Sequence, residues 1–449
     1  MNQLNNLQHK FPVVDSIPES VRLPSQIHQR VSLVDGELKL WAGPTKKTLS
    51  PIWIQQSDGS LQQVELGSYP VMGEKESDEA LEAAVRAYNN GRGEWPMMKV
   101  GERIACMQNF IQRMVEQRDL IIKLIMWEIG KSLADSEKEF DRTITYMRQT
   151  IDALKDLDNA NSRFVIAEGT IGQIRRTPLG VVLCMGPYNY PLNETFATLI
   201  PAMLTDADLD LTVKECLLGA LSFNGQRCTA LKMLMVHRSI ADEFVNRLTT
   251  ELAKLKVGMP WEKGVSITPL PGMHRTAYMT EVIEDAVAKG AKVVNPEGGE
   301  FCKTMFYPAV VYPVTEGMRL YREEQFGPVV PVAVYDDIET VLDYVTTSDH
   351  GQQVSIFGSD PAQIGHLVDT LVHQVCRVNI NCQCQRGPDV FPFGGRKDSA
   401  EGTLSVHDAL RAFSIRSMIA AKQTDDSKGM LASMVSEHYS KFVNTDFIF

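Results

Sequence analysis

The sequence predicts an α/β protein in which a parallel-sheet domain follows an interrupted dinucleotide-binding unit. Strand and helix patterns alternate between residues 329 and 380, which is typical of a parallel sheet covered by helices on both faces. A strand, loop and helix pattern over residues 180–200 matches the first half of a dinucleotide-binding unit. The second, parallel strand does not follow, because the acidic start of another helix comes directly after residue 205.

Length and charge limit the possible functions. A chain of 449 residues is too long for one ordinary core. We predict an N-terminal helical region with the remnant of the dinucleotide-binding domain (1–202), a domain that contains the central thiol (203–403), and a C-terminal strand and tail (404–449). The 45 basic and 56 acidic residues give a formal charge of -11, which argues against a nucleic-acid partner. No apolar run approaches membrane length, so we expect no membrane partner either.

The cysteines and the N-terminus favour a cytoplasmic protein. Eight cysteines are scattered through the chain, a distribution typical of unpaired thiols in a reducing compartment. Residues 1–29 are polar and interrupted by prolines, unlike a targeting leader. Cys382 and Cys384 form one close pair, but His373 is the sole additional ligand nearby, so we expect no metal site.

Helical patterns dominate the first third of the chain, after short pieces over residues 40–72 that are consistent with hairpin strands. Apolar residues repeat at helical spacing in four segments, which begin near Ser77, Ile104, Leu120 and Phe140. The first segment places Leu81, Val85 and Tyr88 on one face, and the third ends at Gly130. Arg142 lies off the apolar stripe of the fourth segment, and a solvated surface arginine is its default interpretation.

The segment 180–200 is the candidate nucleotide element. Gly180 to Met185 forms a short apolar run that predicts a buried strand, and a helix is expected to begin near Asn193. No Gly-x-Gly-x-x-Gly element occurs in the chain, so periodicity alone does not predict a nucleotide cofactor. In parallel sheets, active groups lie in loops at the carboxyl ends of strands, which makes the loops after Met185 and Ile380 candidates.

A thiol stands at the centre of the chain, in Ser222-Phe-Asn-Gly-Gln-Arg-Cys228-Thr-Ala. An Asn-Gly turn presents Cys228 directly after Arg227, and a neighbouring cation favours the nucleophilic thiolate. The alternative is a small buried hydrophobe, which is the usual role of an intracellular cysteine.

Four motifs then indicate a family. They are Gly180-Val-Val-Leu-Cys-Met-Gly-Pro-Tyr-Asn-Tyr-Pro, Phe223-Asn-Gly-Gln-Arg-Cys, Glu323-Glu-Gln-Phe-Gly-Pro and Phe391-Pro-Phe-Gly-Gly-Arg-Lys-Asp-Ser. With these motifs in this order, nearly the whole chain resembles the aldehyde dehydrogenase superfamily. Within it, the chain looks most like the non-phosphorylating, NADP-dependent glyceraldehyde-3-phosphate dehydrogenases of plants and algae. The resemblance implies an aldehyde dehydrogenase-like fold with an interrupted Rossmann-like N-terminal domain.

The resemblance also assigns catalytic and cofactor roles. Cys228 matches the nucleophile that attacks the aldehyde carbonyl, and Asn189 matches the amide that holds the developing oxyanion with the backbone N–H of the cysteine. Glu324 matches the glutamate that positions the nicotinamide ribose, and Phe326 is expected near the ring. Taken singly, Asn189 could equally be a turn residue, Glu324 a loop acid and Phe326 a core aromatic.

For the substrate, members that use phosphorylated aldehydes have a cluster resembling Arg142, Tyr190, Arg227 and Arg386. Guanidinium groups suit a phosphate because their planar forks make charge-assisted hydrogen bonds with its oxygens. Each arginine alone is an ordinary surface residue, whereas their joint presence favours a phosphate site.

The chain departs from the family near Met203. By the usual size of the domain, roughly ninety residues that complete the parallel sheet are missing there. The resemblance implies that they include the segments that hold the cofactor ribose and pyrophosphate, and the glutamate general base. Loss of a general base typically costs 10²–10⁴-fold in rate. A lone remaining strand at 180–185 would also expose its edge and its apolar face unless neighbours cover it.

Three functional hypotheses follow. The first is NADP-dependent oxidation of glyceraldehyde 3-phosphate to 3-phosphoglycerate, impaired by the missing segment. The second is a thiol esterase that uses Cys228 and Asn189 without a cofactor. The third is a non-catalytic subunit that pairs with full-length homologues through strands at 164–176 and 413–420. For all three, the resemblance implies a homo-oligomer, either a dimer or a tetramer.

Overall fold

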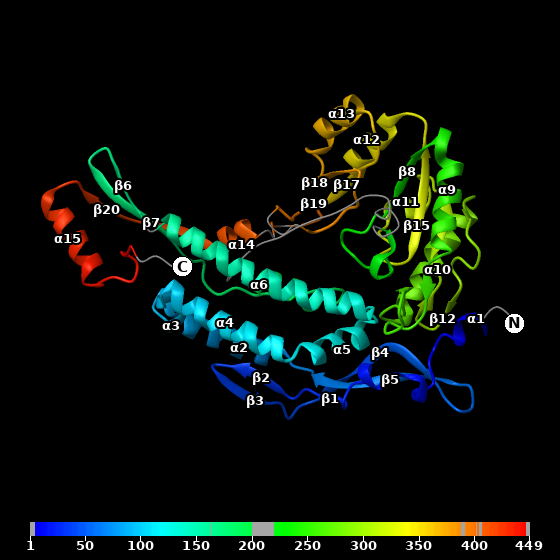
Figure 1. Ribbon diagram of the computed structural model, residues 1–449, viewed down its shortest axis with the longest axis horizontal. Coiled ribbons are helices and arrows are strands. Elements are labelled where there is room, and N and C mark those ends of the chain that lie inside the picture. Colours follow the sequence, from blue (N-terminus) through cyan, green and yellow to red (C-terminus); the bar gives the residue numbers. More distant parts are fainter. Residues whose placement is uncertain are drawn as a thin grey trace.

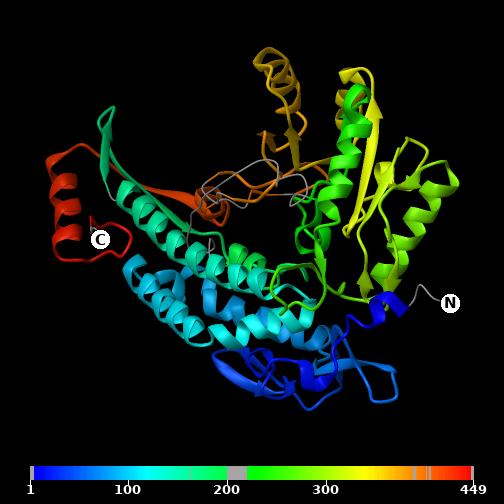
Figure 2. The ribbon, with the colours of Figure 1, turned by 45° about the vertical axis from the view of Figure 1, so that its right-hand side comes forward.

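The protein consists of an N-terminal β layer, a layer of long helices, an α/β region and a projecting arm (Figure 1). The computed structural model describes residues 5–161, 163–199, 220–387, 391–400, 402–403 and 406–445. In two views the α/β region and the arm stand at opposite ends of the molecule, and the long helix α6 runs between them (Figures 1 and 2).

The N-terminal layer is built on a long hairpin, which confirms the strands expected between residues 40 and 72. Its elements are α1 (Asn5–Gln8), β1 (Ile27–His28), β2 (Val31–Val34), β3 (Glu37–Leu40), β4 (Thr45–Gln55) and β5 (Leu61–Pro70). Strands β4 and β5 pair antiparallel, and β1 joins β5 in parallel. Strands β2 and β3 form a separate hairpin.

The helical layer confirms the four predicted helices. Its elements are α2 (Glu74–Tyr88), α3 (Glu94–Met97), α4 (Val100–Glu116), α5 (Arg118–Ile129), α6 (Leu133–Asn161) and α7 (Asn193–Leu199). Helix α5 ends at Gly130, which adopts the left-handed conformation with φ 70°. On α2, Leu81 and Val85 are about half exposed, whereas Ala83 is buried.

The α/β region contains a four-stranded mixed sheet and a separate two-stranded parallel sheet, together with smaller strand pairs. Its first part comprises β8 (Leu234–His237), α9 (Arg238–Leu252), β9 (Lys256–Val257), β10 (Val265–Ile267), α10 (Met273–Ala288), β11 (Lys292–Val293), β12 (Phe301–Cys302), β13 (Met305–Phe306), β14 (Ala309–Tyr312), α11 (Arg319–Arg322) and β15 (Val329–Tyr335). Its second part comprises α12 (Ile338–Thr347), β16 (His350–Gly351), β17 (Gln353–Ile356), α13 (Pro361–Leu371), β18 (Arg377–Ile380) and β19 (Arg396–Lys397). One sheet has the order β11-β14-β15-β8 and the other pairs β17 with β18. The pairs β14–β15, β15–β8 and β17–β18 are parallel. The alternation over residues 329–380 predicted a single parallel sheet, whereas β15 and β17 lie in different sheets.

A shared core joins the N-terminal layer to the α/β region. One buried cluster includes Ile52 of β4, Met126 of α5, Leu234 of β8 and Val332 of β15. Because full burial of such side chains is worth about 1.5–3 kcal/mol each, this cluster fixes the two regions against each other.

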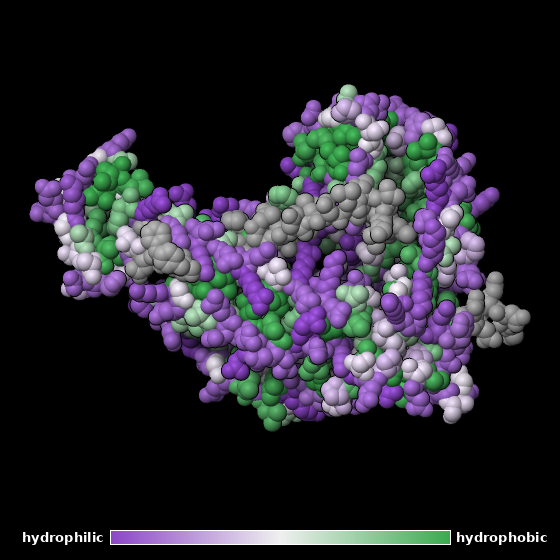
Figure 3. Space-filling model, viewed as in Figure 1, coloured by the Kyte–Doolittle hydropathy of each residue, from purple (hydrophilic) through white to green (hydrophobic). Residues whose placement is uncertain are grey.

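The arm is a three-stranded antiparallel sheet followed by a helix. It contains β6 (Phe164–Ala167), β7 (Thr170–Pro178), α14 (Val406–Ala412), β20 (Ser414–Lys422) and α15 (Asp425–Ser436). The sheet order is β20-β7-β6. Apolar side chains gather on its surface (Figure 3), among them Val165, Ile166 and Met418, each more than half exposed.

The predicted buried strand at Gly180–Met185 is wrong. These residues form no strand, and the side chains of Leu183 and Met185 are 81% and 76% exposed. A run of apolar residues becomes a buried strand only where neighbouring strands satisfy its backbone and cover its faces. Here the described residues supply no such neighbours, so the apolar run lies on the surface.

Two predictions fall on residues that the structure does not describe. The helix expected from Asp206 and the deletion expected near Met203 both lie outside the described residues. Among the helices that are described, none is long and apolar enough to cross a membrane.

Candidate active site

Left-handed residues and buried hydrogen bonds fix the backbone of the loop that carries Cys228. Residues 222–225 form a short 3-10 turn in which Phe223 and Asn224 have φ values of 49° and 56°. Gly225 has φ 71°, and a Cβ there would lie 2.5 Å from the carbonyl oxygen of Gly327. Asn224 is fully buried, donating to the Thr268 carbonyl at 3.1 Å and accepting from the Thr268 N–H at 3.0 Å. The predicted Asn-Gly turn is therefore confirmed.

Cys228 opens onto a large cleft between the sheet that ends in β8 and the pair β17–β18. The cleft has a volume of about 1410 Å³, and its lining includes Cys228, Lys232 and Glu324. Strand β8 lies on one side and β17 on the other, and each is the last strand of its sheet. The thiol therefore stands at the mouth of a space wide enough for a substrate.

The predicted activation of the thiol is wrong in this structure. Although Cys228 is exposed to the cleft, the surrounding protein removes enough water from the thiol to raise its pKa, and the carboxylate of Glu194 raises it further. A hydrogen bond with Gln352 opposes the shift. The guanidinium of Arg227 donates to Gln383 Oε1 at 3.2 Å, while Arg386 and Lys232 are cations that lower the pKa of the Cys228 thiol.

Asn189 lies beside the same loop. Its side-chain amide is buried and donates to the carbonyl oxygen of Gln226 at 2.8 Å, two residues before Cys228. A primary amide has two N–H groups, so Asn189 can also donate to an oxygen that develops negative charge near the thiol. The structure thus brings together the two residues for which catalytic roles were predicted.

A buried ion pair, which the sequence analysis missed, supports Asn189. Lys131 is 1% exposed and donates to Glu139 at 2.5 Å and to the Asn189 carbonyl at 3.0 Å. The second oxygen of Glu139 accepts from the backbone N–H groups of Leu192 and Asn193 at 3.1 and 3.2 Å. One signal could have indicated this pair: the two opposite charges flank the start of the fourth apolar helix.

Three residues of the predicted phosphate cluster lie close together. Burial raises the pKa of Tyr190, whereas the nearby guanidinium groups of Arg227 and Arg142 lower it, so both cations act on the phenol. Arg142 is half-buried on α6, not a fully solvated surface residue. The Tyr190 ring packs edge-on against Phe223, with 6.2 Å between the ring centroids.

Arg386, the fourth member, lies in the loop after β18, where the parallel-sheet rule placed a candidate site. It is 7% exposed, and its guanidinium is 4.9 Å from the ring centroid of Phe393. It forms an ion pair with Glu194 of α7. Both groups act electrostatically on Cys228, so Arg386 belongs to the same site.

Glu324 and Phe326 both lie close to one lysine, Lys232. Lys232 Nζ is 3.3 Å from Glu324 Oε1 and 4.4 Å from the centroid of the Phe326 ring. Burial lowers the pKa of Lys232 to about 8, while Glu324 opposes this shift. The sequence analysis missed Lys232 because a lone lysine four residues after the thiol carries no recognisable spacing.

The residues expected to hold the nicotinamide end of a dinucleotide are present, but the platform for the other end is not described. Glu324 lines the cleft that Cys228 enters, and Phe326 contacts Lys232, which lines the same cleft. The strand that would begin the nucleotide-binding sheet is instead the exposed, unpaired run at 180–185. The described residues therefore do not fit a complete dinucleotide.

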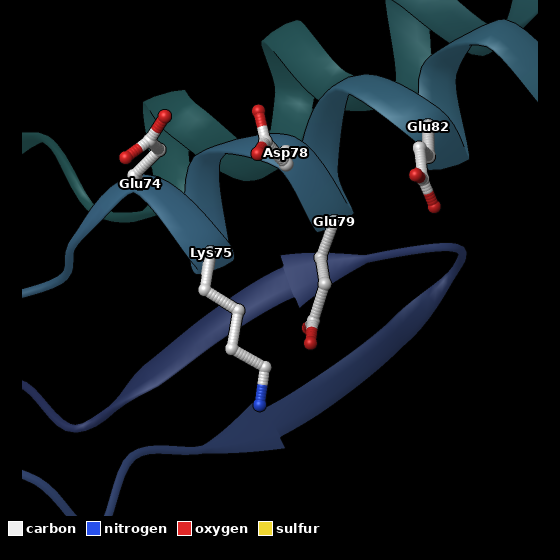
Figure 4. Close-up of a pocket in the computed structure, with 5 residues that line it drawn as sticks. All are labelled: Glu74, Lys75, Asp78, Glu79 and Glu82. Carbon is white, nitrogen blue, oxygen red and sulfur yellow. The ribbon is translucent and has the colours of Figure 1, made fainter.

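A second hollow, on α2, has a different character. It is lined by Glu74, Lys75, Asp78, Glu79 and Glu82. Figure 4 shows Lys75 and Glu79 directed toward the β2–β3 hairpin, where Glu79 pairs with Lys39 at 3.7 Å. These charges are solvated, and within the described ranges no group of three or more His, Cys, Asp or Glu residues is arranged to hold a metal.

Comparison with known proteins identifies the class to which this fold and thiol site belong. The sequence model of the aldehyde dehydrogenase family matches residues 55–205 and 202–419, and the chain belongs to this family of NAD(P)-dependent oxidoreductases. The predicted α/β fold and family are thus confirmed.

Among its relatives, the NADP-dependent glyceraldehyde-3-phosphate dehydrogenase of Streptococcus equinus is 26% identical over 458 positions, covering 80% of this chain and 93% of the relative. The enzyme of the same name from Arabidopsis thaliana is 35% identical over 208 residues, 46% of this chain and 41% of that enzyme. The chain therefore spans less than half of the plant relative. A crystal structure of the NADP-dependent glyceraldehyde-3-phosphate dehydrogenase from Bacillus halodurans, complexed with NADP, aligns with a TM-score of 0.77 at 24% identity, covering 89% of this chain and all of that chain.

The comparisons also bear on the shortened domain. The two segments that match the family meet at residues 202–205, where the sequence departs from the expected pattern. Because 80% of 449 residues is about 359, about 99 of the 458 positions aligned with the Streptococcus relative have no counterpart in this chain. This difference is close to the size of the segment expected to be missing.

Proposed function

We propose that the chain is an aldehyde dehydrogenase-family oxidoreductase that acts on glyceraldehyde 3-phosphate through a covalent adduct on Cys228, with oxidation severely impaired. The observation that carries the proposal is the hydrogen bond from the Asn189 amide to the Gln226 carbonyl, which holds an oxyanion donor beside the thiol loop. The relatives named above, which are NADP-dependent glyceraldehyde-3-phosphate dehydrogenases, support this choice of substrate and cofactor.

In this proposal the chain's own residues perform the first chemical step. The Cys228 sulfur adds to the aldehyde carbon as its thiol proton passes to water in the cleft, and the carbonyl π electrons move to the oxygen, which gains the negative charge. The Asn189 amide and the backbone N–H of Cys228 stabilise that charge, a contribution that typically reaches about 2.7–4 kcal/mol for one donor. Arg142, Tyr190, Arg227 and Arg386 bind the phosphate and orient the aldehyde.

We propose that oxidation is the impaired step. NADP, when bound, would supply the hydride acceptor, with Glu324 and Phe326 at its nicotinamide end. The described residues offer no sheet for the rest of the dinucleotide. Correct positioning can supply about 7–11 kcal/mol of barrier reduction, so weak retention of the cofactor strongly lowers turnover.

The test is turnover of the purified chain with glyceraldehyde 3-phosphate and NADP, followed by the absorbance of the reduced cofactor. We expect very slow turnover that Cys228→Ser abolishes. Rapid, Cys228-dependent turnover contradicts the impairment, and residual turnover unchanged by Cys228→Ser contradicts the assignment of the nucleophile.

We also propose a second role, as a subunit that associates with itself and with full-length homologues through the arm. The exposed apolar side chains of β6 and β20, including Ile166, Ile415 and Met418, favour it because such a surface is unfavourable in water. Native mass spectrometry should show oligomers that Met418→Glu dissociates. A monomeric wild-type chain that also fails to co-elute with a homologue contradicts this role.

A further inference from the structure

The anion cluster contains a carboxylate that pairs directly with one of its arginines. Glu194 lies in the first turn of α7 and forms an ion pair with Arg386, and the two side chains are 17% and 6% exposed. The Arg386 guanidinium also packs near the rings of Phe393 and Tyr146. A pair so shielded from water interacts more strongly than one on the surface.

The other acidic groups near the cluster are engaged elsewhere. Glu139 binds Lys131 and two backbone N–H groups, and Asp135 accepts from the hydroxyl of Ser132 at 2.8 Å. Glu194, by contrast, forms its ion pair with a predicted phosphate ligand, Arg386. Its charge also reaches the thiol, since it follows burial among the causes that raise the pKa of Cys228.

The groups around the thiol come from several elements. Gln352 lies next to β17, Arg386 in the loop after β18, and Lys232 just before β8. All three lower the pKa of Cys228, and Glu194 of α7 opposes them. Neutralising Glu194 therefore leaves a more positive environment for both a phosphate and a thiolate.

We propose that Glu194 is a specificity-determining residue whose carboxylate occupies Arg386 as an internal counter-ion that the phosphate of a substrate must displace. The proposal rests on the proposed function, because it takes Arg386 as a phosphate ligand. Its physical basis is that a carboxylate and a phosphate repel each other while they compete for one guanidinium, and like charges brought together cost affinity.

The test uses inorganic phosphate as the probe and alkylation of Cys228 by iodoacetamide as the readout. Peptide mass spectrometry must follow Cys228 alone, because other cysteines, among them Cys106 and Cys382, are also reduced. Phosphate bound at Arg386 slows alkylation by its bulk and by its charge. In Glu194→Gln, we expect the half-protecting phosphate concentration to fall roughly fivefold or more, since the competing charge is gone.

Three further variants keep the test decisive. Glu194→Ala is also neutral and serves if Glu194→Gln does not fold, as judged by circular dichroism. Glu82→Gln is the matched control: it removes a carboxylate paired with an arginine, Arg86, at 3.8 Å on the distant helix α2. We expect the wild-type phosphate concentration in Glu82→Gln and, because the charge is kept, in Glu194→Asp.

An unchanged half-protecting concentration in a folded neutral variant overturns the proposal, as does an equal change in Glu82→Gln. Failure of the proposed function gives a different result: no aldehyde is turned over by any variant, while phosphate still protects Cys228 more strongly in the neutral variants than in wild type.

Discussion

At the residue scale, the properties of the site follow from which side chains form hydrogen bonds and ion pairs with one another. The spacing of Arg227 and Cys228 suggested direct activation, yet adjacent residues direct their side chains to different partners. Arg227 donates to Gln383, and the charges that favour the thiolate come from Lys232 and Arg386. Lys232 lies four residues after Cys228, and Arg386 lies far along the chain. The reactivity of the thiol therefore depends on tertiary contacts that the motif does not encode.

Asn189→Ala should separate an oxyanion role from a structural one. Acylation of Cys228 by nitrophenyl acetate passes through a tetrahedral oxyanion and needs no cofactor, so we expect it to slow roughly 100-fold or more without the amide. Release of nitrophenol measures it, and the same assay tests thiol esterase activity. Alkylation of Cys228 by iodoacetamide develops no oxyanion and should change little. Equal loss in both reactions would mean that Asn189 only maintains the loop.

Lys232 should titrate well below an ordinary lysine. Its pKa of about 8 implies that the free amine accumulates as pH rises through that value. We expect modification of Lys232 by an amine-selective reagent, quantified by peptide mass spectrometry, to have its pH midpoint near 8. Because Glu324 raises the pKa, Glu324→Gln should move the midpoint to lower pH. A midpoint that stays in place after this substitution contradicts the ion pair seen here.

At the element scale, the sequence predicted the elements whose formation depends on local pattern. Helices α4, α5 and α6 and the parallel pair β17–β18 appear where periodicity placed them. The run Gly180–Met185 has the composition of a buried strand and is nevertheless exposed, because a strand also requires neighbours, and a local pattern does not supply them. The ion pair of Lys131 and Glu139 left only a weak local signal, two opposite charges near the start of α6, and its burial against the loop before α7 depends on tertiary contacts.

That ion pair should be essential to the contact between α6 and the loop before α7. Lys131→Met leaves the Glu139 carboxylate buried without its cation, a change that typically costs about 3–5 kcal/mol. We expect the free energy of unfolding in urea to fall by that amount. A glutamine carbonyl can still accept from Leu192 and Asn193, so the double variant Lys131→Met/Glu139→Gln should recover part of the loss. A single variant within about 1 kcal/mol of wild type would contradict a structural role for the pair.

At the scale of the whole molecule, buried contacts support the thiol side of the predicted site. Among the described residues, the cofactor side lacks the sheet that was expected to support it. The thiol loop, Asn189 and the arginines are held by buried contacts between the helical layer and the α/β region. The cofactor side has Glu324 and Phe326, whereas the segment that should begin its sheet lies on the surface. The chain should therefore keep its thiol chemistry and retain NADP poorly.

Thermal unfolding with and without NADP measures how strongly the chain binds the cofactor. A ligand stabilises the native state by RT ln(1 + [L]/Kd), so a cofactor at about 1 mM with a Kd above that concentration adds less than about 0.4 kcal/mol. We expect the melting temperature of this chain to change by no more than the measurement error. The full-length Streptococcus equinus enzyme, as the positive control, should gain about 2.7 kcal/mol at a hundredfold excess over its Kd. An equal rise in both proteins would show that this chain retains a dinucleotide platform, and it would contradict the proposed impairment.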